Sequence, residues 1–491
     1  MQQNVSRRRF LGGLAVGGTI VGLNPLTNLW VTSASAHAPG TLPVPRLDGV
    51  LLTDQASREA VGQDVGGLVF ETPRAVLRPG SVRDIQKMMR YCLANGLKVA
   101  ARGQGHTVFG QSQVDGGLSI DMSTLDAIDE ITADHVVVEG GAVWKDVLAL
   151  TMEQNLAPPV LTDFKGLSVG GTLSVGGIGS SAYRHGALVD QVLEIEVVDG
   201  RGEHLVCNAC QNRELFDAVL AGLGQCAIVV KAKVKLAPVG PMVRYSVLTY
   251  ADSATFFADF KTLIARKELE FLWGSLRFDP TGGRWLYEIN GVSAFTPPSA
   301  PDDAQLYRGL HFDPSAKTSQ EMPTFAFQTF VDGAIDLFRS MGLWDGVAHP
   351  WFDVFVPGSK IETYLAQVLP TIDPMVDVGM VGFFLMFPIA PGKMNRPMLK
   401  VPREETGFLF DILTSANAPG YDAAYNQRML DRNRRLFELA RSLGGSKYNI
   451  AAIPFSQRDW IRQLGPSYFE LARQKLRHDP GGILTPGPGI F

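Results

Sequence analysis

The sequence has little cysteine, and this scarcity excludes a fold held together by disulfide bonds. Only four cysteines, Cys92, Cys207, Cys210 and Cys226, occur in 491 residues, so the fold must depend on its hydrophobic core. Cys207 and Cys210 form a single Cys-x-x-Cys motif. A zinc site normally needs a second pair or nearby histidines, so two packed thiols are the favoured interpretation. A disulfide or redox pair and a metal site are the alternatives.

The sequence also lacks a basic region that could bind nucleic acid. The 45 Lys and Arg residues are balanced by 49 Asp and Glu residues, which gives a formal net charge of −4. No run of basic residues is long enough to follow a phosphate backbone, so we expect no nucleic-acid partner. Long apolar runs are absent as well. The apolar stretch at 378–390 has only 13 residues, too few to cross a bilayer, and it suits a buried pair of strands.

The N-terminus is typical of an export signal. Arginines at 7–9 precede an uncharged stretch at 10–23, and small residues follow at 33–38, which is the order of a signal peptide. The paired arginines resemble the twin-arginine signal. We therefore expect a twin-arginine-type signal peptide at 1–36, cleaved after Ala36 or Ala38, and a periplasmic or secreted protein without a membrane span. An ordinary secretory signal is the alternative.

The length predicts a globular protein of two or three lobes. Hydrophobic residues make up 45% of the chain and charged residues 19%, so the chain can bury a sizeable core. Strands alternate with helices without a fixed repeat, which indicates an α+β fold. The expected strands lie at 75–77, 97–103, 135–141, 191–198, 203–207 and 227–236, and the expected helices at 81–96, 143–154 and 423–443.

Local signals mark the first helix and a change of character farther along the chain. Ser81 with Asp84 resembles a capping box, and Gly96 stands where a helix C-terminal glycine belongs. After Pro238 the segments become longer and more mixed, so we expect a second lobe at about 241–445. The end of the chain, HDPGGILTPGPGIF at 478–491, is too rich in Pro and Gly for a helix.

Glycine is present in excess. The 52 glycines exceed a tenth of the chain, against a usual share of about 7%, and they lack the triplet period of collagen. Three clusters concentrate them, at 102–111, 168–186 and 222–225. The first follows a strand and matches neither a dinucleotide fingerprint nor a P-loop. It still suits a backbone cradle for a polyanion, whose phosphates need free amide donors. Ordinary tight turns are the alternative for each cluster alone.

In this order, the motifs resemble those of FAD-linked oxidoreductases of the vanillyl-alcohol-oxidase type, and they are most similar to cytokinin dehydrogenases. The resemblance implies an α+β, two-lobed flavoprotein. A PCMH-type FAD-binding domain would occupy 40–240, completed by 446–491, with an inserted α+β substrate-binding domain at 241–445. The resemblance is strong over the first two thirds of the flavin lobe and weak over the second lobe. It rests on AVLRPGS at 75–81, ARGQGHTVFGQ at 101–111, LTDFKGLSVGGTLSVGGIG at 161–179, YRHG at 183–186, ELFDAVLAGLGQ at 214–225 and the C-terminal segment.

The resemblance implies FAD as the cofactor and no metal. His106 matches the histidine that this family joins covalently to the flavin ring. A loop histidine beside a non-covalent flavin is the alternative. Berberine-bridge-type relatives attach the flavin through a second residue, a cysteine. No cysteine lies between Cys92 and Cys207, so a single covalent attachment is expected. The residues implied to bind FAD are Arg102, Gly103, Gln104, Gly105, His106, Thr107, Gly110, Gln111, Thr162, Asp163, Ser168, Gly170, Gly171, Ser174, Gly176, Gly177 and Ile228.

Asp163 matches the aspartate that faces the substrate in cytokinin dehydrogenases and accepts its amine hydrogen bond. Removal of hydride from a C–H next to N–H or O–H leaves a cationic product unless a base takes the proton, and a positioned carboxylate contributes about 10²–10⁴-fold. A cap on the turn before the glycine loop is the alternative role for Asp163. Arg184 and His185 would contact the pyrophosphate or the flavin edge, or else lie on a surface loop.

The second lobe departs from the family pattern at two positions. Trp273 stands where the family has a substrate-binding glutamate, and Met394 stands where it has a tryptophan. We therefore expect a substrate pocket that has lost a polar anchor and gained aromatic bulk, which puts cytokinin itself in doubt. An aromatic or otherwise apolar substrate with an oxidisable alcohol or amine fits such a pocket.

Three functions are compatible with these motifs. The first is a cytokinin dehydrogenase-like oxidoreductase that takes hydride from a C–H next to an amine or alcohol. The second is a sugar, alcohol or natural-product oxidase on the same fold. Both require a small-molecule substrate and either oxygen or another electron acceptor. The third is an exported flavin-binding protein without turnover, and the presence of both His106 and Asp163 weighs against it.

Overall fold

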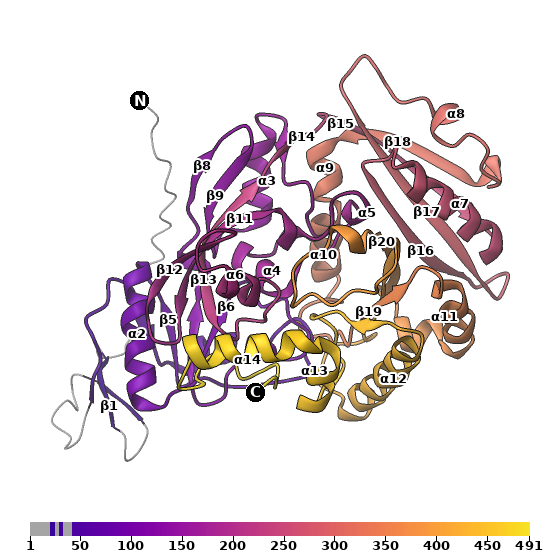
Figure 1. Cartoon of the computed structure of the whole chain (residues 1–491). Coiled ribbons are helices and arrows are strands. Elements are labelled where there is room, and N and C mark those ends of the chain that lie inside the picture. The colour runs from indigo at the N-terminus through magenta and orange to yellow at the C-terminus, as the bar shows by residue number, and fades with distance from the viewer. Residues whose placement is uncertain (1–19, 25–28, 33–41) are drawn as a thin grey trace.

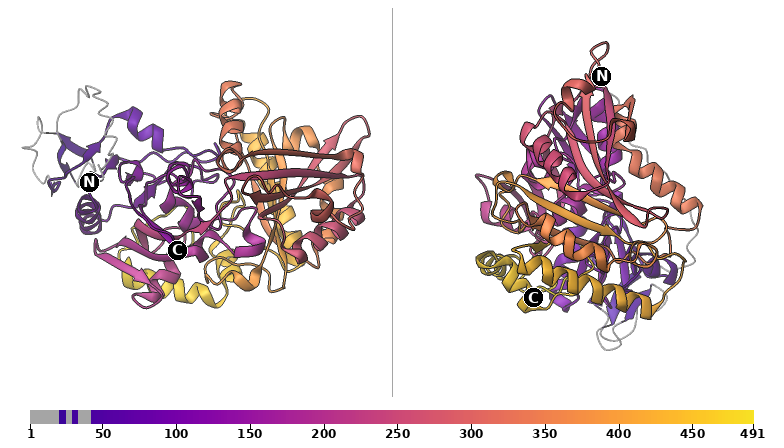
Figure 2. Two further views of the ribbon diagram at one scale, coloured as in Figure 1. Left: turned by 90° about the horizontal axis from the view of Figure 1, so that it is seen from above. Right: turned by 90° about the vertical axis from the view of Figure 1, so that its right-hand side faces the viewer.

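The computed structural model describes residues 20–24, 29–32 and 42–491. The expected twin-arginine motif at 6–12 and the cleavage zone at 33–38 lie outside these residues. Near the N-terminus, three short strands form a small sheet of order β2-β1-β3. They are β1 (Ile20–Asn24), β2 (Leu29–Thr32) and β3 (Leu42–Pro43). The rest of the chain forms two lobes that lie side by side (Figures 1 and 2).

The first lobe begins with a four-stranded sheet of order β4-β5-β7-β6. Its last three strands run parallel, and α2 (Val82–Asn95) connects β5 to β6 and buries Ile85, Met88 and Met89 completely. The expected strand, helix and strand between 75 and 103 are thus confirmed. The strands are β4 (Val50–Leu52), β5 (Ala75–Arg78), β6 (Val99–Arg102) and β7 (Leu118–Asp121), with α1 (Gln55–Val61) after β4.

The two ends of α2 differ in how well the sequence predicted them. Gly96 has a φ of 64° and its N–H donates to the Cys92 carbonyl, so it is the expected C-terminal glycine. The expected capping box at the other end does not form. The Ser81 hydroxyl donates to Asp48 over 2.8 Å, while the Asp84 carboxylate accepts from the N–H groups of Asp48, Gly49 and Gly80. Asp84 therefore holds the incoming chain instead of the helix end.

A five-stranded sheet of order β12-β11-β13-β9-β8 forms the centre of the first lobe. Its strands confirm the expected strands at 135–141 and 227–236 and the expected hairpin at 191–207, whose arms pair antiparallel. Cys207 is buried in β12 and Cys210 is exposed after it, and both are free thiols. The strands are β8 (Ile128–Ile131), β9 (His135–Glu139), β11 (Val192–Asp199), β12 (His204–Asn208) and β13 (Ala227–Lys235).

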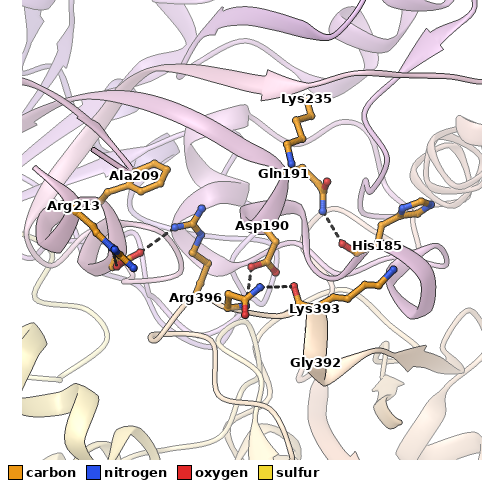
Figure 3. A pocket seen from close by; sticks show the side chains of 12 residues that line it. His185, Asp190, Gln191, Ala209, Arg213, Lys235, Gly392, Lys393 and Arg396 are labelled. Atoms are coloured by element: carbon orange, nitrogen blue, oxygen red, sulfur yellow. Dashed lines mark hydrogen bonds and ion pairs between the residues drawn. The ribbon is translucent and has the colours of Figure 1, made fainter. Parts of the chain in front are cut away.

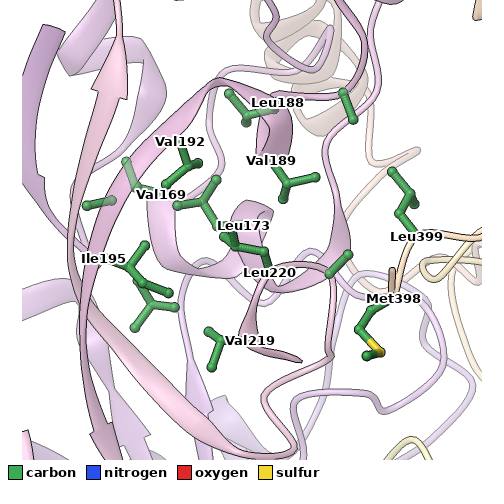
Figure 4. Close-up of a cluster of buried hydrophobic side chains, with 14 of the residues drawn as sticks. Val169, Leu173, Leu188, Val189, Val192, Ile195, Val219, Leu220, Met398 and Leu399 are labelled. Atoms are coloured by element: carbon green, nitrogen blue, oxygen red, sulfur yellow. The ribbon is translucent and has the colours of Figure 1, made fainter. Parts of the chain in front are cut away.

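Helices of the first lobe and helices from the C-terminal end of the chain pack around this sheet. Figure 4 shows Leu173, Val189, Ile195 and Val219 packed together in the core of the lobe. The C-terminal α14 (Pro466–His478), yellow in Figure 1, packs beside α6, and Leu484 pairs with Val99 of β6. The other elements here are α3 (Trp144–Met152), α4 (Val169–Val175), α5 (Ala182–His185), α6 (Arg213–Val219), α13 (Gln457–Leu464), β10 (Leu156–Ala157), β14 (Ala237–Pro238) and the short helices η2 (Met122–Thr124) and η3 (Leu188–Gln191).

The second lobe is built on an eight-stranded antiparallel sheet of order β18-β15-β17-β16-β20-β21-β19-β22. The apolar stretch at 378–390 contributes one strand, β20, and not the expected pair. The strands are β15 (Met242–Tyr250), β16 (Phe271–Asp279), β17 (Arg284–Phe295), β18 (Lys317–Pro323), β19 (Phe352–Pro357), β20 (Phe383–Ile389), β21 (Gly407–Leu413) and β22 (Ser446–Lys447).

Helices α7 (Ser253–Arg266), α11 (Ile361–Val368) and α12 (Ala423–Ser442) cover one face of this sheet, and the other face is left toward the first lobe (Figure 1). Phe256, Phe384, Phe410 and Phe437 belong to the core under the helices. The expected helix at 423–443 is confirmed as α12, and within the described ranges no helix combines the length and apolar character needed to cross a bilayer. The helices are α7 (Ser253–Arg266), α8 (Asp303–Leu306), α9 (Thr324–Gln328), α10 (Phe330–Ser340), α11 (Ile361–Val368) and α12 (Ala423–Ser442), with short turns η4 (Pro314–Ala316), η5 (Leu369–Thr371), η6 (Pro374–Val378) and η7 (Pro391–Lys393).

The loop after β20 fastens the second lobe to the first (Figure 3). The Arg396 guanidinium lies 3.0 Å from the Asp217 carboxylate and donates to the Val189 carbonyl over 3.1 Å. The Asn395 N–H donates to Asp190 over 2.9 Å. A hollow of about 540 Å³ beside these contacts is lined by charged side chains of both lobes. Because those side chains already hold the loop in place, we assign the hollow a structural role.

Candidate active site

A cavity of about 670 Å³ lies between the glycine loops of the first lobe and the open face of the eight-stranded sheet. The first lobe supplies residues from 101–107, 162–164, 167–178 and 223–229. The second lobe supplies side chains from the strands between β15 and β21 and from helix α10. Both walls are therefore needed to form one site.

The glycine loop after β6 must contain glycine at position 105. Gly105 has a φ of 66°, and a Cβ atom there would lie 2.0 Å from the Arg102 guanidinium. Arg102 itself runs behind the loop, where its Nη1 donates to the Gln63 carbonyl over 2.6 Å. Burial lowers the pKa of Arg102. Arg102 thus supports the loop from the side away from the cavity.

The same loop offers free hydrogen-bond donors to the cavity. The backbone N–H groups of Gly103, Gln104, Gly105 and His106 form no hydrogen bond with any residue that the structure describes, and all four residues line the cavity. Successive unpaired amides around a left-handed residue form a concave site for an anion. The loop therefore fits the diphosphate of FAD, and these four residues would hold it.

Asp64 holds the loop in this shape. Its Oδ2 accepts from the Gly110 N–H over 2.7 Å and from the Thr107 hydroxyl over 2.9 Å. Burial raises the pKa of Asp64 to about 6, against the hydrogen bonds that lower it. Gln111 ties the next turn to the segment that follows β22, since its amide donates to the Ile450 carbonyl over 2.9 Å. No sequence pattern pointed to Asp64, because it lies in an irregular segment far before the motif.

His106 projects into a group of aromatic side chains. Its ring centroid lies 4.7 Å from that of Phe164, 5.3 Å from Trp351 and 6.3 Å from Trp344. Burial lowers the pKa of His106 to about 3, and the nearby charges of His349 and Arg339 act in the same direction. The imidazole is therefore neutral at physiological pH and has an unprotonated ring nitrogen.

Asp163 lines the cavity from a loop fixed by its neighbour Lys165. The Lys165 ammonium donates to the carbonyls of Thr162 and Asp163 over 2.7 and 3.1 Å, and the Lys165 N–H donates to Asp332 over 3.1 Å. Burial raises the pKa of Asp163, while Lys165 opposes the shift. The arrangement provides a carboxylate that is a stronger base than one in water.

The sheet wall presents a cross-strand row of residues to the cavity. Neighbouring positions across β17, β16, β20, β21 and β19 are Glu288, Ser275, Leu385, Asp411 and Asp353, and all five line the cavity. The alternate residues of these strands point to the other face of the sheet, toward the helices. The register of the sheet, which no local pattern reveals, therefore selects the groups that reach the cavity.

Polar groups surround Trp273, which lines the cavity and stacks on Tyr245 with ring centroids 5.6 Å apart. The Tyr245 hydroxyl donates to Asn290 over 2.6 Å, and the Asn290 amide donates to the Ser275 hydroxyl over 2.9 Å. Glu288 accepts from Ser275 over 3.2 Å. The wall thus has polar side chains on β17, next to β16, although Trp273 replaces the polar side chain expected from the family pattern on β16. Glu288 and Asn290 alternate with apolar residues along β17, and this alternation could have identified both from the sequence.

Most of the predicted cofactor residues line the cavity, but four do not. Those in the wall are Gly103, Gln104, Gly105, His106, Thr107, Gln111, Thr162, Asp163, Ser168, Gly170, Gly171, Ser174 and Ile228. Arg102 and Gly110 support the loop from behind, as described above. Gly176 and Gly177 lie in the turn after α4, where the Gly177 N–H donates to the Tyr448 hydroxyl over 3.0 Å.

The structure does not place Met394 in the cavity wall. It follows η7 and is buried in the core of the first lobe with Met398 and Leu399, because the loop that carries it is fastened to that lobe. Arg184 and His185 also lie elsewhere. Arg184 donates to the Leu269 carbonyl over 3.0 Å, and His185 lines the hollow of Figure 3.

Comparison with known proteins assigns both parts of the chain to recognised families. Residues 73–208 match the FAD binding domain family. Residues 281–491 match the family described as cytokinin dehydrogenase 1, FAD and cytokinin binding. The flavin resemblance expected for the first lobe thus extends over the second.

Two relatives align along almost the whole chain. An uncharacterized oxidoreductase of the fasciation locus in Rhodococcoides fascians is 35% identical over 442 residues, which are 90% of this chain and 99% of that protein. Cytokinin dehydrogenase 4 of Arabidopsis thaliana is 31% identical over 500 residues, and the alignment covers 92% of this chain and 94% of that protein. The expected resemblance to cytokinin dehydrogenases is confirmed.

A solved structure shares the fold. The crystal structure of 6-hydroxy-D-nicotine oxidase from Arthrobacter nicotinovorans superposes with a TM-score of 0.68 at 20% identity, and the match covers 89% of this chain and 96% of that one. The expected fold class is therefore confirmed: a two-lobed α+β flavoprotein.

Replacement of Asp64 by Ala should weaken FAD binding, because the Gly110 N–H and the Thr107 hydroxyl lose their acceptor and the loop loses its shape. We expect at least a tenfold loss of affinity, from removal of two hydrogen bonds worth about 1 kcal/mol each. Asp64→Asn keeps an acceptor oxygen and should retain FAD. The ratio of flavin absorbance to protein absorbance in the purified variants measures the difference. Equal occupancy in Asp64→Ala and the unchanged protein would contradict this role.

Proposed function

The chain belongs to the FAD-dependent oxidoreductases of the vanillyl-alcohol-oxidase type, in the branch of the cytokinin dehydrogenases, and from this membership we propose that it removes hydride from a substrate C–H next to an amine or alcohol. When bound, FAD supplies hydride acceptance. The observation that carries the proposal is the position of Asp163. It lines the same cavity as the free amides that fit FAD and as His106.

Asp163 acts as the base in this proposal. It accepts the proton of the substrate N–H or O–H while hydride leaves the adjacent carbon, so the product leaves without a positive charge. A general base works best when its pKa is near the working pH. Burial raises the pKa of Asp163 in that direction, and Lys165 keeps its loop in place.

Replacement of Asp163 by Asn should slow flavin reduction by about 10²–10⁴-fold, because the amide cannot take the proton. In the unchanged protein the rate should fall as the pH drops through the raised pKa of Asp163, since only the carboxylate is a base. Anaerobic stopped-flow reduction of the flavin with isoprenoid adenines, sugars and aryl alcohols measures both effects and identifies the substrate class. An Asn variant that reduces its flavin at the normal rate would remove Asp163 from the mechanism.

We also propose that His106 is the attachment point of a covalent flavin. Its neutral ring nitrogen can form a bond to carbon, and its ring lies among aromatic side chains in the cavity wall. Acid precipitation of the unchanged protein should leave the yellow chromophore in the pellet, whereas precipitation of His106→Ala should release it to the supernatant. A yellow pellet from the alanine variant would contradict the attachment at His106.

A second candidate is a sugar, alcohol or natural-product oxidase on the same fold. The observation that favours it is the stack of Trp273 and Tyr245 in the cavity wall, whose ring centroids lie 5.6 Å apart. Such a wall binds flat apolar groups in general and does not require an adenine. The same panel of substrates separates this candidate from a cytokinin dehydrogenase.

Export by the twin-arginine route is the remaining proposal, and the motif SRRRFLG at 6–12 supports it. Replacement of Arg7 and Arg8 by Lys keeps the charge and removes the arginine pair. The variant should accumulate in the cytoplasm while the unchanged protein is found outside it, as immunoblots of cell fractions will report. An unaltered distribution would favour an ordinary secretory signal.

A further inference from the structure

Two buried aspartates face each other across the sheet and are not used by the reaction proposed above. Asp353 on β19 and Asp411 on β21 are directly paired in register, and each is only 3% exposed. Their carboxyl groups lie close enough to affect each other's ionisation directly. Asp353 Oδ2 and Asp411 Oδ1 receive no hydrogen bond from a donor in the part of the chain that the structure describes. A proton shared between the two groups satisfies this contact, and the pair then carries one negative charge.

Among the residues that the structure describes, no cation in the cavity wall neutralises that charge. Among the described residues that line the cavity there is no Lys or Arg. Lys447 is close enough to affect Asp353 electrostatically, but its ammonium donates to the Ile453 carbonyl over 3.0 Å and lies over the Phe455 ring. Glu288, the carboxylate at the other end of the row, is paired with Arg277 over 3.1 Å. Asp353 and Asp411 form no such ion pair with any part of the chain that the structure describes.

The lack of a cationic partner disfavours ionisation of both carboxyl groups. Burial raises the pKa of Asp353 to about 7 and that of Asp411 well above its ordinary value, and the negative neighbours Asp353 and Asp163 raise the latter further. A buried charge without a partner is strongly unfavourable. A cation that enters the cavity would remove this cost.

The space beside the pair is apolar. Leu385 lies between Asp411 and Ser275 in the cross-strand row, and Phe383, Phe387 and Leu409 line the cavity around it. With a strand spacing of about 4.8 Å, the polar group at Ser275 lies about 10 Å from Asp411. A ligand that fills this part of the cavity therefore needs an apolar body with a positive group at one end.

We propose that Asp353 and Asp411 together bind a protonated amine on an otherwise apolar substrate. This inference rests on the proposed function, because it assigns a substrate class to the same cavity. It makes the two aspartates specificity residues for cationic amines, with the apolar body against Leu385 and the phenylalanines. Neutral alcohols and sugars would bind without this contact.

The test compares two probes of the same shape, 4-phenylbutylamine and 4-phenylbutan-1-ol. At a pH of about 8 the alkylamine is protonated, and each dissociation constant is measured from the perturbation of the flavin absorbance under anaerobic conditions. We expect the unchanged holoenzyme to bind the amine at least about tenfold more tightly than the alcohol, the effect of a charge-assisted hydrogen bond. The absence of any preference in the unchanged protein would overturn the proposal.

Isosteric variants separate charge from shape. Asp353→Asn and Asp411→Asn each leave one carboxylate and should keep the preference, whereas the double variant should lose it and bind the alcohol as before. The matched control is Asp259→Asn, a buried aspartate of the same lobe that lies outside the cavity and accepts from Tyr250 and His311. It should keep the full preference. A double variant that still prefers the amine would overturn the proposal.

Flavin content distinguishes the remaining outcomes. Loss of FAD from a folded double variant would assign the pair to the cofactor and overturn the proposal. Because the probes are measured by binding, the result does not depend on turnover. Amine preference without flavin reduction by any substrate would contradict the proposed function alone, whereas flavin reduction without amine preference would contradict this inference alone.

Discussion

The site depends on the short segment at 448–450, which joins all of its parts. The Asn449 amide donates to the carbonyls of Val175 and Ala221 over 3.1 and 3.0 Å, so it connects the second and third glycine loops. The Tyr448 hydroxyl accepts from Gly177, and the Ile450 carbonyl accepts from Gln111 of the first loop. The Tyr448 N–H donates to the Asp353 carbonyl of β19 over 3.0 Å. A shift of this segment would therefore move every glycine loop relative to the sheet wall.

The two walls held together in this way have opposite electrostatic character. The loop wall offers unpaired N–H groups at 103–106, which favour anions. The sheet wall offers Asp353 and Asp411, and the loop facing it carries Asp163. Burial raises the pKa of all three carboxyl groups, because it removes them from water and so disfavours their charged form. The cavity thus separates a wall that suits an anionic cofactor from the carboxyl groups that we propose bind substrate protons and cations.

The sequence predicted the loop wall well because a backbone cradle is encoded locally. A diphosphate needs consecutive free amides, these need glycine at positions such as Gly105, and so the signal lies in a few adjacent residues. His106 and Asp163 belong to the same motifs and line the cavity with them. Asp64 escaped prediction because it lies about 40 residues before the loop that it holds. The capping box expected from Ser81 and Asp84 failed for a related reason: a distant segment, at 48–49, competes for the carboxylate.

The sheet wall could not be predicted in the same way, since its residues come from separate strands and meet only through register. A one-residue slip of β21 would turn Asp411 toward the helices and Phe410 into the cavity. Trp273 lies in the wall because β16 is central in the sheet, whereas Met394 lies in a loop that the first lobe captures. Single side chains on separate strands can change without disturbing the loops. Relatives at 31% identity can therefore share the cofactor site while the strand positions of each adapt the same cavity to a different substrate.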